Sequence, residues 1–181
     1  MLQTTGLILS GGGARAAYQV GVLAAISRMR REAGAPDVNP FPVISGTSAG
    51  AINAAFLASN ADRFDAALDD LVHIWKNFQV EQVYRSDVLG MIRSGARWLS
   101  LLSLGWLIAQ KKLRPKSLLN NDPLSELLAH HIHFERLPAL LEQGHLRALA
   151  ITASSYSTGE HVTFYDSCHP VTPWIRNQRL A

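Results

Sequence analysis

Apolar and polar positions along the first fifty residues predict a strand, a helix and a second strand. An apolar run at residues 5–10 predicts a short buried strand, and residues 17–31 carry apolar side chains at helical spacing with basic residues in the last turn. A second apolar run leads through Ile44 into the next strand. Two strands joined by a helix favour a parallel α/β sheet, in which the loops at the carboxyl ends of the strands carry function.

The remaining chain predicts three more helices and two more strands. The expected helices span residues 49–59, 61–78 and 123–133. The expected strands span residues 146–154 and 161–165, and their short, turn-rich connection favours a hairpin. In the helix at 61–78 the apolar positions share one side. The opposite side is expected to be a solvated face formed by Asp62, Asp65, Asp69 and Asp70.

The turn after the second strand has the G-x-S-x-G pattern of a nucleophile elbow, with Gly46, Ser48 and Gly50 at its three fixed positions. Glycines without a β-carbon let the strand and the following helix pass close to each other, so the turn can lift the serine hydroxyl clear of the backbone. Backbone N–H groups at the helix N-terminus favour negative charge at the same spot. We therefore predict that Ser48 is a nucleophile. The alternative is a glycine-rich turn with only a packing role.

A second glycine cluster, Gly11, Gly12 and Gly13, follows the first strand and precedes a helix. A serine alkoxide attacking an ester creates an oxyanion, and successive backbone N–H groups in such a loop can stabilise it. Arg15 could add positive charge or fix the loop.

The same cluster also matches the dinucleotide fingerprint G-x-G-x-x-A, from Gly11 to Ala16. That interpretation needs an acidic residue at the end of the second strand, whereas Glu32 falls near a helix end and Asp37 in the loop before the strand. The second strand ends instead in the serine turn, which favours the oxyanion role. A Walker phosphate loop is absent from the sequence.

A serine hydroxyl needs a positioned base near neutral pH. His161, Asp166 and His169 follow the elbow in the chain order of a hydrolase triad, but nothing in their spacing singles one of them out.

Composition narrows the class of protein. The 181 residues suit one domain, and a net charge of +3 is too weak and scattered to argue for nucleic acid. One cysteine, Cys168, excludes an internal disulfide and a cysteine-based metal cluster, which is compatible with a reducing compartment. No basic leader precedes an apolar stretch at the N-terminus, and no uncharged run reaches the roughly 20 residues that span a bilayer. These features favour a cytoplasmic protein.

An uncharged segment from Trp98 to Ala109 contains two tryptophans and is followed by Lys111 and Lys112. This composition suits a peripheral contact with a lipid surface or a lipophilic lid. A buried core helix is the alternative.

The ordered pair of motifs, Gly11 to Ala16 and then Gly46 to Gly50, resembles the patatin-like phospholipase family, and residues 119–124 resemble a segment of its bacterial members. The resemblance implies a three-layer α/β/α fold with a mainly parallel sheet. It implies an acyl-ester hydrolase that uses a Ser–Asp dyad on phospholipids or other acyl lipids, with no metal or organic cofactor. Ser48 would be the nucleophile. The oxyanion region would comprise Gly11, Gly12, Gly13 and Arg15.

The sequence departs from the family pattern at the second member of the dyad. The family's Asp stands in an Asp-Gly-Gly or Asp-Gly-Ala motif, and no Asp of this chain is followed by Gly. We therefore expect residues 1–181 to be the N-terminal part of a patatin-like domain whose dyad Asp lies beyond Ala181, with an incomplete fold and part of the sheet uncovered. A complete chain that has lost its base is the alternative.

Two other functions remain open at the level of sequence. One is a non-catalytic lipid- or membrane-binding protein on the same scaffold. The other is an α/β-hydrolase with a histidine base, although the elbow falls early, after a single strand–helix unit.

Overall fold

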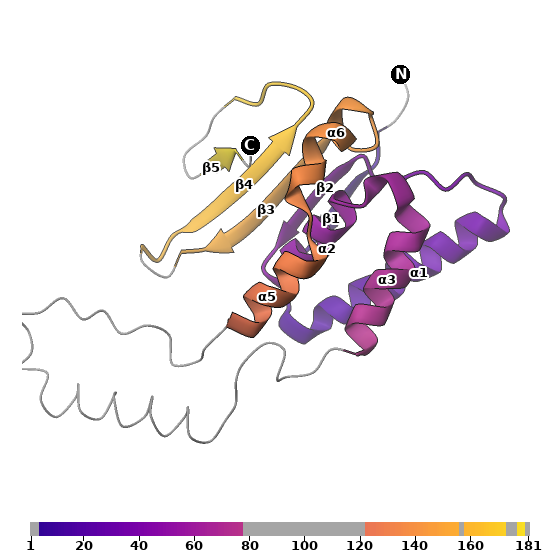
Figure 1. Cartoon of the computed structure of the whole chain (residues 1–181), viewed down its shortest axis with the longest axis horizontal. Coiled ribbons are helices and arrows are strands. Elements are labelled where there is room, and N and C mark those ends of the chain that lie inside the picture. The colour runs from indigo at the N-terminus through magenta and orange to yellow at the C-terminus, as the bar shows by residue number, and fades with distance from the viewer. Residues whose placement is uncertain (1–3, 78–121, 156–157, 173–176, 180–181) are drawn as a thin grey trace, which may run out of the picture. The chain divides into compact units, whose positions relative to one another are not determined.

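A computed structural model describes residues 4–77, 122–155, 158–172 and 177–179 (Figure 1). The chain divides into two compact units, Met1–Asn77 with His131–Ala181, and Phe78–His130. The predicted lipid-contacting segment from Trp98 to Ala109 lies outside the described residues. Within the described ranges, no helix is both long enough and apolar enough to cross a membrane.

The elements follow the predicted order with small shifts at their ends. The strands are β1 Gly6–Leu9, β2 Val43–Thr47, β3 Ala148–Ser154, β4 His161–Ser167 and β5 Asn177–Arg179. The α-helices are α1 Ala16–Glu32, α2 Ala49–Ala58, α3 Phe64–Lys76, α5 Asp122–His131 and α6 Leu137–Glu142. Short 3₁₀ turns, η1 Gly13–Arg15, η2 Ala61–Arg63 and η4 Phe134–Arg136, precede α1, α3 and α6. The sequence pattern did not predict α6 and β5, which are too short to show a period.

The sheet has the order β1-β2-β3-β4-β5. The pairs β1–β2, β2–β3 and β4–β5 are parallel, whereas β3 and β4 form the predicted antiparallel hairpin. One rung runs from Leu9 through Gly46 to Ile151, so the carboxyl ends of β1, β2 and β3 meet at one edge of the sheet. The predicted α/β fold with a mainly parallel sheet is confirmed.

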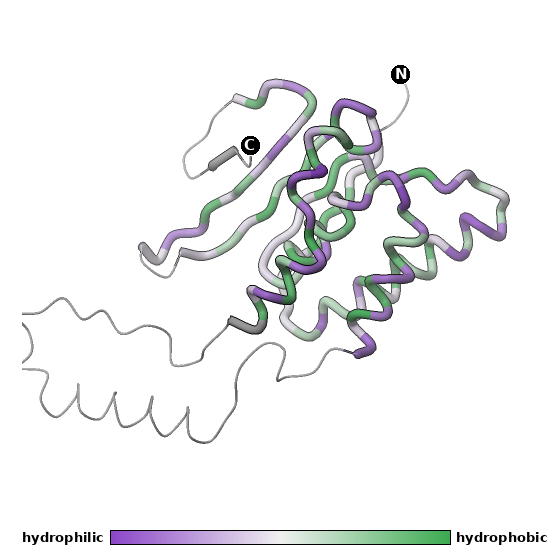
Figure 2. Tube along the Cα trace, viewed as in Figure 1, coloured by the Kyte–Doolittle hydropathy of each residue, from purple (hydrophilic) through white to green (hydrophobic). Residues whose placement is uncertain are grey.

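The core lies on one face of this sheet. Ile44 and Leu149 are buried beneath α2, which contacts β1, β2 and β3, while α1 and α3 pack against each other and against α2. Figure 2 shows hydrophobic stretches along the strands and through α2. On the other face Ile8 is 83% exposed. Of the three expected layers, the described residues therefore supply the sheet and one helical layer.

The aspartates of α3 and its preceding turn do not form the wholly solvated face that the sequence predicted. Asp65 is buried because it lies in the first turn of α3 opposite α1, where its carboxylate accepts a 2.5 Å hydrogen bond from the Ser27 hydroxyl. The other three aspartates lie in ion pairs, Asp62 with Arg136, Asp69 with Arg31 and Asp70 with Arg63.

Arg136, which directly precedes α6, forms hydrogen bonds with the end of α2 and the turn that follows it. Its guanidinium donates to the Ser59 carbonyl at 2.6 Å, to the Asn60 side-chain oxygen at 3.1 Å and to Asp62 at 2.7 Å. A cation at the last carbonyls of a helix also interacts favourably with the helix dipole.

The buried Ser27–Asp65 contact should contribute more to stability than the exposed ion pairs. We expect Ser27→Ala to lower the free energy of unfolding by about 1–3 kcal/mol, because a buried carboxylate loses a donor. Arg31→Ala, which breaks an exposed pair on the same helix, should cost about 1 kcal/mol or less. Urea unfolding measures both, and equal losses would contradict the prediction.

Candidate active site

Ser48 occupies the sharp turn between β2 and α2 with φ 55° and ψ −124°. Among the described residues it is the only one other than glycine with positive φ. Such a conformation costs on the order of 1–3 kcal/mol and persists only where the surroundings hold it. Here the Ser48 N–H donates to the Thr152 carbonyl at 3.1 Å, and the Ser48 carbonyl accepts from Ala51 N–H at 2.9 Å.

The Ser48 side chain is exposed at the carboxyl edge of the sheet. It stands at the N-cap position of α2 but makes no capping hydrogen bond. Serine at this position usually caps the helix through its hydroxyl. The turn therefore presents the hydroxyl to solvent instead of using it to begin the helix.

Gly46 and Gly50 let backbone segments meet around this serine. A Cβ added to Gly46 would overlap the Gly50 carbonyl and lie 2.6 Å from Ala54 Cβ. A Cβ added to Gly50 would overlap the Leu9 carbonyl and lie 2.6 Å from the Ser10 carbonyl oxygen. The first turn of α2 thus rests directly on the end of β1.

This contact brings the glycine loop to the serine. A Cβ added to Gly11 would lie 3.2 Å from Ser48 Cβ and 3.9 Å from Ser48 Oγ. Gly11 and Ser48 are therefore neighbours although 37 positions separate them in the sequence.

The rest of the loop turns away into α1. A Cβ added to Gly12 would have only Arg15 Cβ within 4 Å, and one added to Gly13 would have nothing. Gly13 has φ +56°, which favours glycine, and the Arg15 N–H donates to the Gly12 carbonyl at 3.2 Å to close the turn. The Arg15 side chain is exposed. Gly11 is thus the member of the predicted oxyanion region that contacts Ser48 directly.

Two of the three candidate bases lie at the far end of the sheet. Asp166 is buried opposite Leu149, which pairs with Ile44 of β2. Ser48 comes four residues after Ile44, or about 13 Å along the strand direction. His169 lies beyond the same end of β4 as Asp166.

His161 lies at the end of the sheet that carries Ser48. It begins β4 opposite Ser154, two rungs past the Thr152 position that accepts the Ser48 N–H. Its side chain is exposed. Among the described residues, no group of three or more histidine, cysteine, aspartate or glutamate side chains is arranged to hold a metal ion.

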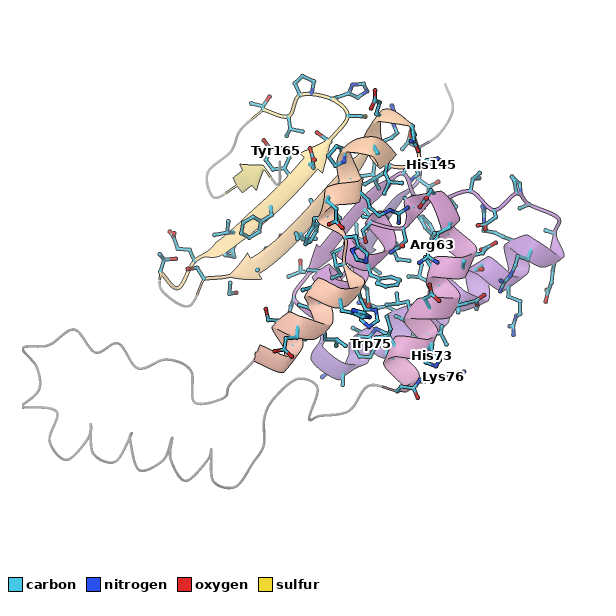
Figure 3. All side chains as sticks on the ribbon, viewed as in Figure 1. Arg63, His73, Trp75, Lys76, His145 and Tyr165 are labelled. Carbon is cyan, nitrogen blue, oxygen red and sulfur yellow. The ribbon has the colours of Figure 1, made fainter. Side chains whose placement is uncertain are left out.

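Three side chains behind the glycine loop form a hydrogen-bonded connection that the sequence analysis did not identify. Trp75 of α3 donates to Asn53 of α2, and Asn53 donates toward Gln19 of α1. Figure 3 shows Trp75 on the side of α3 that faces the other helices. A polar Asn inside the otherwise apolar α2 was the available signal in the sequence.

The family model of patatin-like phospholipases matches residues 7–176, which include the glycine loop, the elbow and the hairpin. The chain belongs to the patatin-like phospholipase family. The family resemblance inferred from the two glycine motifs is confirmed.

One solved structure resembles the chain at low sequence identity. A solved structure, the heterodimeric ExoU–SpcU complex of the type III secretion system of Pseudomonas aeruginosa, matches with 20% identity and a TM-score of 0.36. The match covers 91% of this patatin-like chain and 33% of the other, so this chain spans about a third of that protein's length. No curated protein sequence matches the chain significantly.

The surroundings of Gly50 and Gly21 predict opposite effects of a change to alanine on the free energy of unfolding. Gly50→Ala should lower the free energy of unfolding by about 3 kcal/mol or more, because the new methyl group meets the backbone of β1. Gly21→Ala, in the middle of α1 with open space around it, should raise it by about 0.5–1 kcal/mol. Thermal and urea unfolding test both. A Gly50→Ala protein as stable as the wild type would contradict the close packing.

Proposed function

We propose that this patatin-like chain carries the serine nucleophile of a lipid acyl hydrolase that acts on phospholipids or other acyl lipids. The observation that supports it best is the Ser48 turn: an exposed hydroxyl on a backbone of positive φ, directly beside Gly11. Strain held by close glycine packing is typical of a functional turn. A turn with only a packing role would not need a serine at the one non-glycine position of positive φ in the described chain.

The proposed reaction has two halves. Ser48 Oγ attacks the ester carbonyl carbon while its proton passes to a general base. The alcohol or lysolipid leaves with that proton, and the acyl group stays on Ser48. Water then attacks the acyl-serine, its proton passes to the same base, and the carboxylic acid leaves as Ser48 is restored.

The negative charge that develops on the carbonyl oxygen falls beside the glycine loop. Backbone N–H groups of residues 11–13 are the proposed donors, with Arg15 adding positive charge to the region. Gly11 carries the strongest support because it adjoins Ser48. The contribution of Gly12, Gly13 and Arg15 follows from the family pattern.

The proposed base is the aspartate of a Ser–Asp dyad. The register argues against Asp166, which lies at the opposite end of the sheet, and no Asp of residues 1–181 has the family's following Gly. We therefore assign the base to a segment beyond Ala181. Contact with a membrane surface through the segment from Trp98 to Ala109 remains a prediction from composition.

Hydrolysis of a short-chain chromogenic ester tests the proposal on residues 1–181 and on the chain extended to the stop codon of its gene. In the form that is active, Ser48→Ala should lower kcat by about 10⁴-fold or more, because the nucleophile is removed. Ser167→Ala, at the far end of β4, is the matched control and should leave kcat unchanged.

The activities of the two forms, with and without Ser48, distinguish the proposed dyad from the alternative functions. Activity of the extended form alone supports a dyad base beyond Ala181. Ser48-dependent turnover by residues 1–181 would overturn that assignment and make His161 the next residue to replace. A folded protein that binds acyl chains with and without Ser48, and hydrolyses none of them, would establish the non-catalytic lipid-binding alternative.

A further inference from the structure

A chain of hydrogen bonds runs from α3 to the residue that precedes the glycine loop. Trp75 Nε1 donates to Asn53 Oδ1 at 2.9 Å, and Asn53 Nδ2 donates to Gln19 Oε1 at 3.4 Å and to the Ala16 carbonyl at 3.2 Å. Gln19 Nε2 then donates to the Ser10 carbonyl at 2.8 Å. Asn53 is fully buried, and Gln19 is half-buried.

The donors and acceptors along this series of hydrogen bonds can be arranged in only one order. An indole N–H can donate but cannot accept, so Trp75 must face the oxygen of the Asn53 amide. The Asn53 nitrogen is thereby turned toward α1, where it donates to the Ala16 carbonyl and to the oxygen of Gln19. The Gln19 nitrogen must then face Ser10. The indole N–H and the carbonyls of Ala16 and Ser10 together fix the orientation of the two amides.

The last bond of the chain fixes a peptide plane beside Ser48. A trans peptide is planar, with its carbonyl and N–H pointing in opposite directions. The Ser10 carbonyl accepts from Gln19 and lies close to Gly50, where an added Cβ would meet its oxygen at 2.6 Å. The N–H of Gly11, in the same peptide unit, is therefore directed away from α1. Gly11 is the loop residue that adjoins Ser48.

We infer that Gln19 is a positioning residue for the oxyanion site, with Asn53 and Trp75 holding it in place. This inference rests on the proposed hydrolase function. Gln19 acts through the Ser10–Gly11 peptide and not on the substrate. Its bond keeps the Gly11 N–H in a fixed direction before the oxyanion forms, which is the condition under which such a donor is effective.

Gln19 is suited to a test because it is only half-buried and lies on the regular helix α1. Gln19→Met keeps the length of the side chain and removes both hydrogen bonds. Gln19→Glu, assayed at pH 8, keeps an oxygen for Asn53 but sets a carboxylate against the Ser10 carbonyl. Gln143→Met and Gln143→Glu, at the exposed end of α6, are the matched controls.

Steady-state ester hydrolysis by the active form of the protein, together with the rate at which a fluorophosphonate labels Ser48, provides the readout. We expect Gln19→Met to lower kcat by about 10-fold or more, less than the 10²–10³-fold typical of deleting an oxyanion donor, with KM within about twofold of the wild type. Gln19→Glu should be at least as impaired as Gln19→Met. The labelling rate should fall in parallel, and the Gln143 variants should match the wild type.

The possible failures are distinguishable. A wild type without Ser48-dependent turnover overturns the proposed function, and this inference with it. Ser48-dependent turnover with an unchanged kcat in Gln19→Met overturns the positioning role alone. A Gln19→Glu protein clearly more active than Gln19→Met also overturns it, because the bond to Asn53 would then matter and the bond to Ser10 would not. Thermal unfolding confirms that each variant is folded at the assay temperature.

Discussion

The close approach of backbone to backbone at Gly46 and Gly50 is the constraint on which the rest of the site depends. Without β-carbons at these positions, the end of β2, the first turn of α2 and the end of β1 come into direct contact. That contact forces the connection between β2 and α2 into a turn too short for an ordinary backbone, and Ser48 takes positive φ as a result. The same contact brings Gly11 beside Ser48. The geometry of the site is therefore set more by the absence of glycine side chains than by attractive interactions.

The helices behind the sheet make this arrangement rigid. Helix α2 is almost wholly buried, so its apolar side chains fix where the elbow begins. Among the described residues, polar contacts then join these helices to one another at separate points. Ser27 with Asp65 joins α1 to α3, Arg136 holds the chain before α6 to the end of α2, and Asn53 joins α1, α2 and α3. Within the part of the chain that the structure describes, every buried side-chain nitrogen or oxygen has a hydrogen-bond partner, which favours a single packing of the helices.

Sequence alone predicted what depends on local pattern. The order of strands and helices up to residue 77, the antiparallel hairpin and the elbow could be read from apolar spacing and from glycines at fixed positions. Asp65 was misassigned because an aspartate in the first turn of a helix looks solvated until the partner from α1 is known. The role of Gln19 could not be predicted for the same reason, since its two partners, Ser10 and Asn53, lie outside its own helix. Periodicity assigns a residue to a face of a helix but does not identify the atoms opposite it.

The antiparallel hairpin has a consequence for how such a site can vary. Because β4 runs against β3, the turn that joins them lies at the same edge of the sheet as Ser48, while the loops at the other edge are remote from it. At the base of that turn the Ser155 N–H donates to the Glu160 carbonyl at 2.7 Å, which closes the ladder. Insertions or substitutions between these two residues can therefore reshape the approach to the serine without disturbing the strands. The hairpin thus places a connecting turn, as well as strand ends, at the edge of the sheet that carries the site.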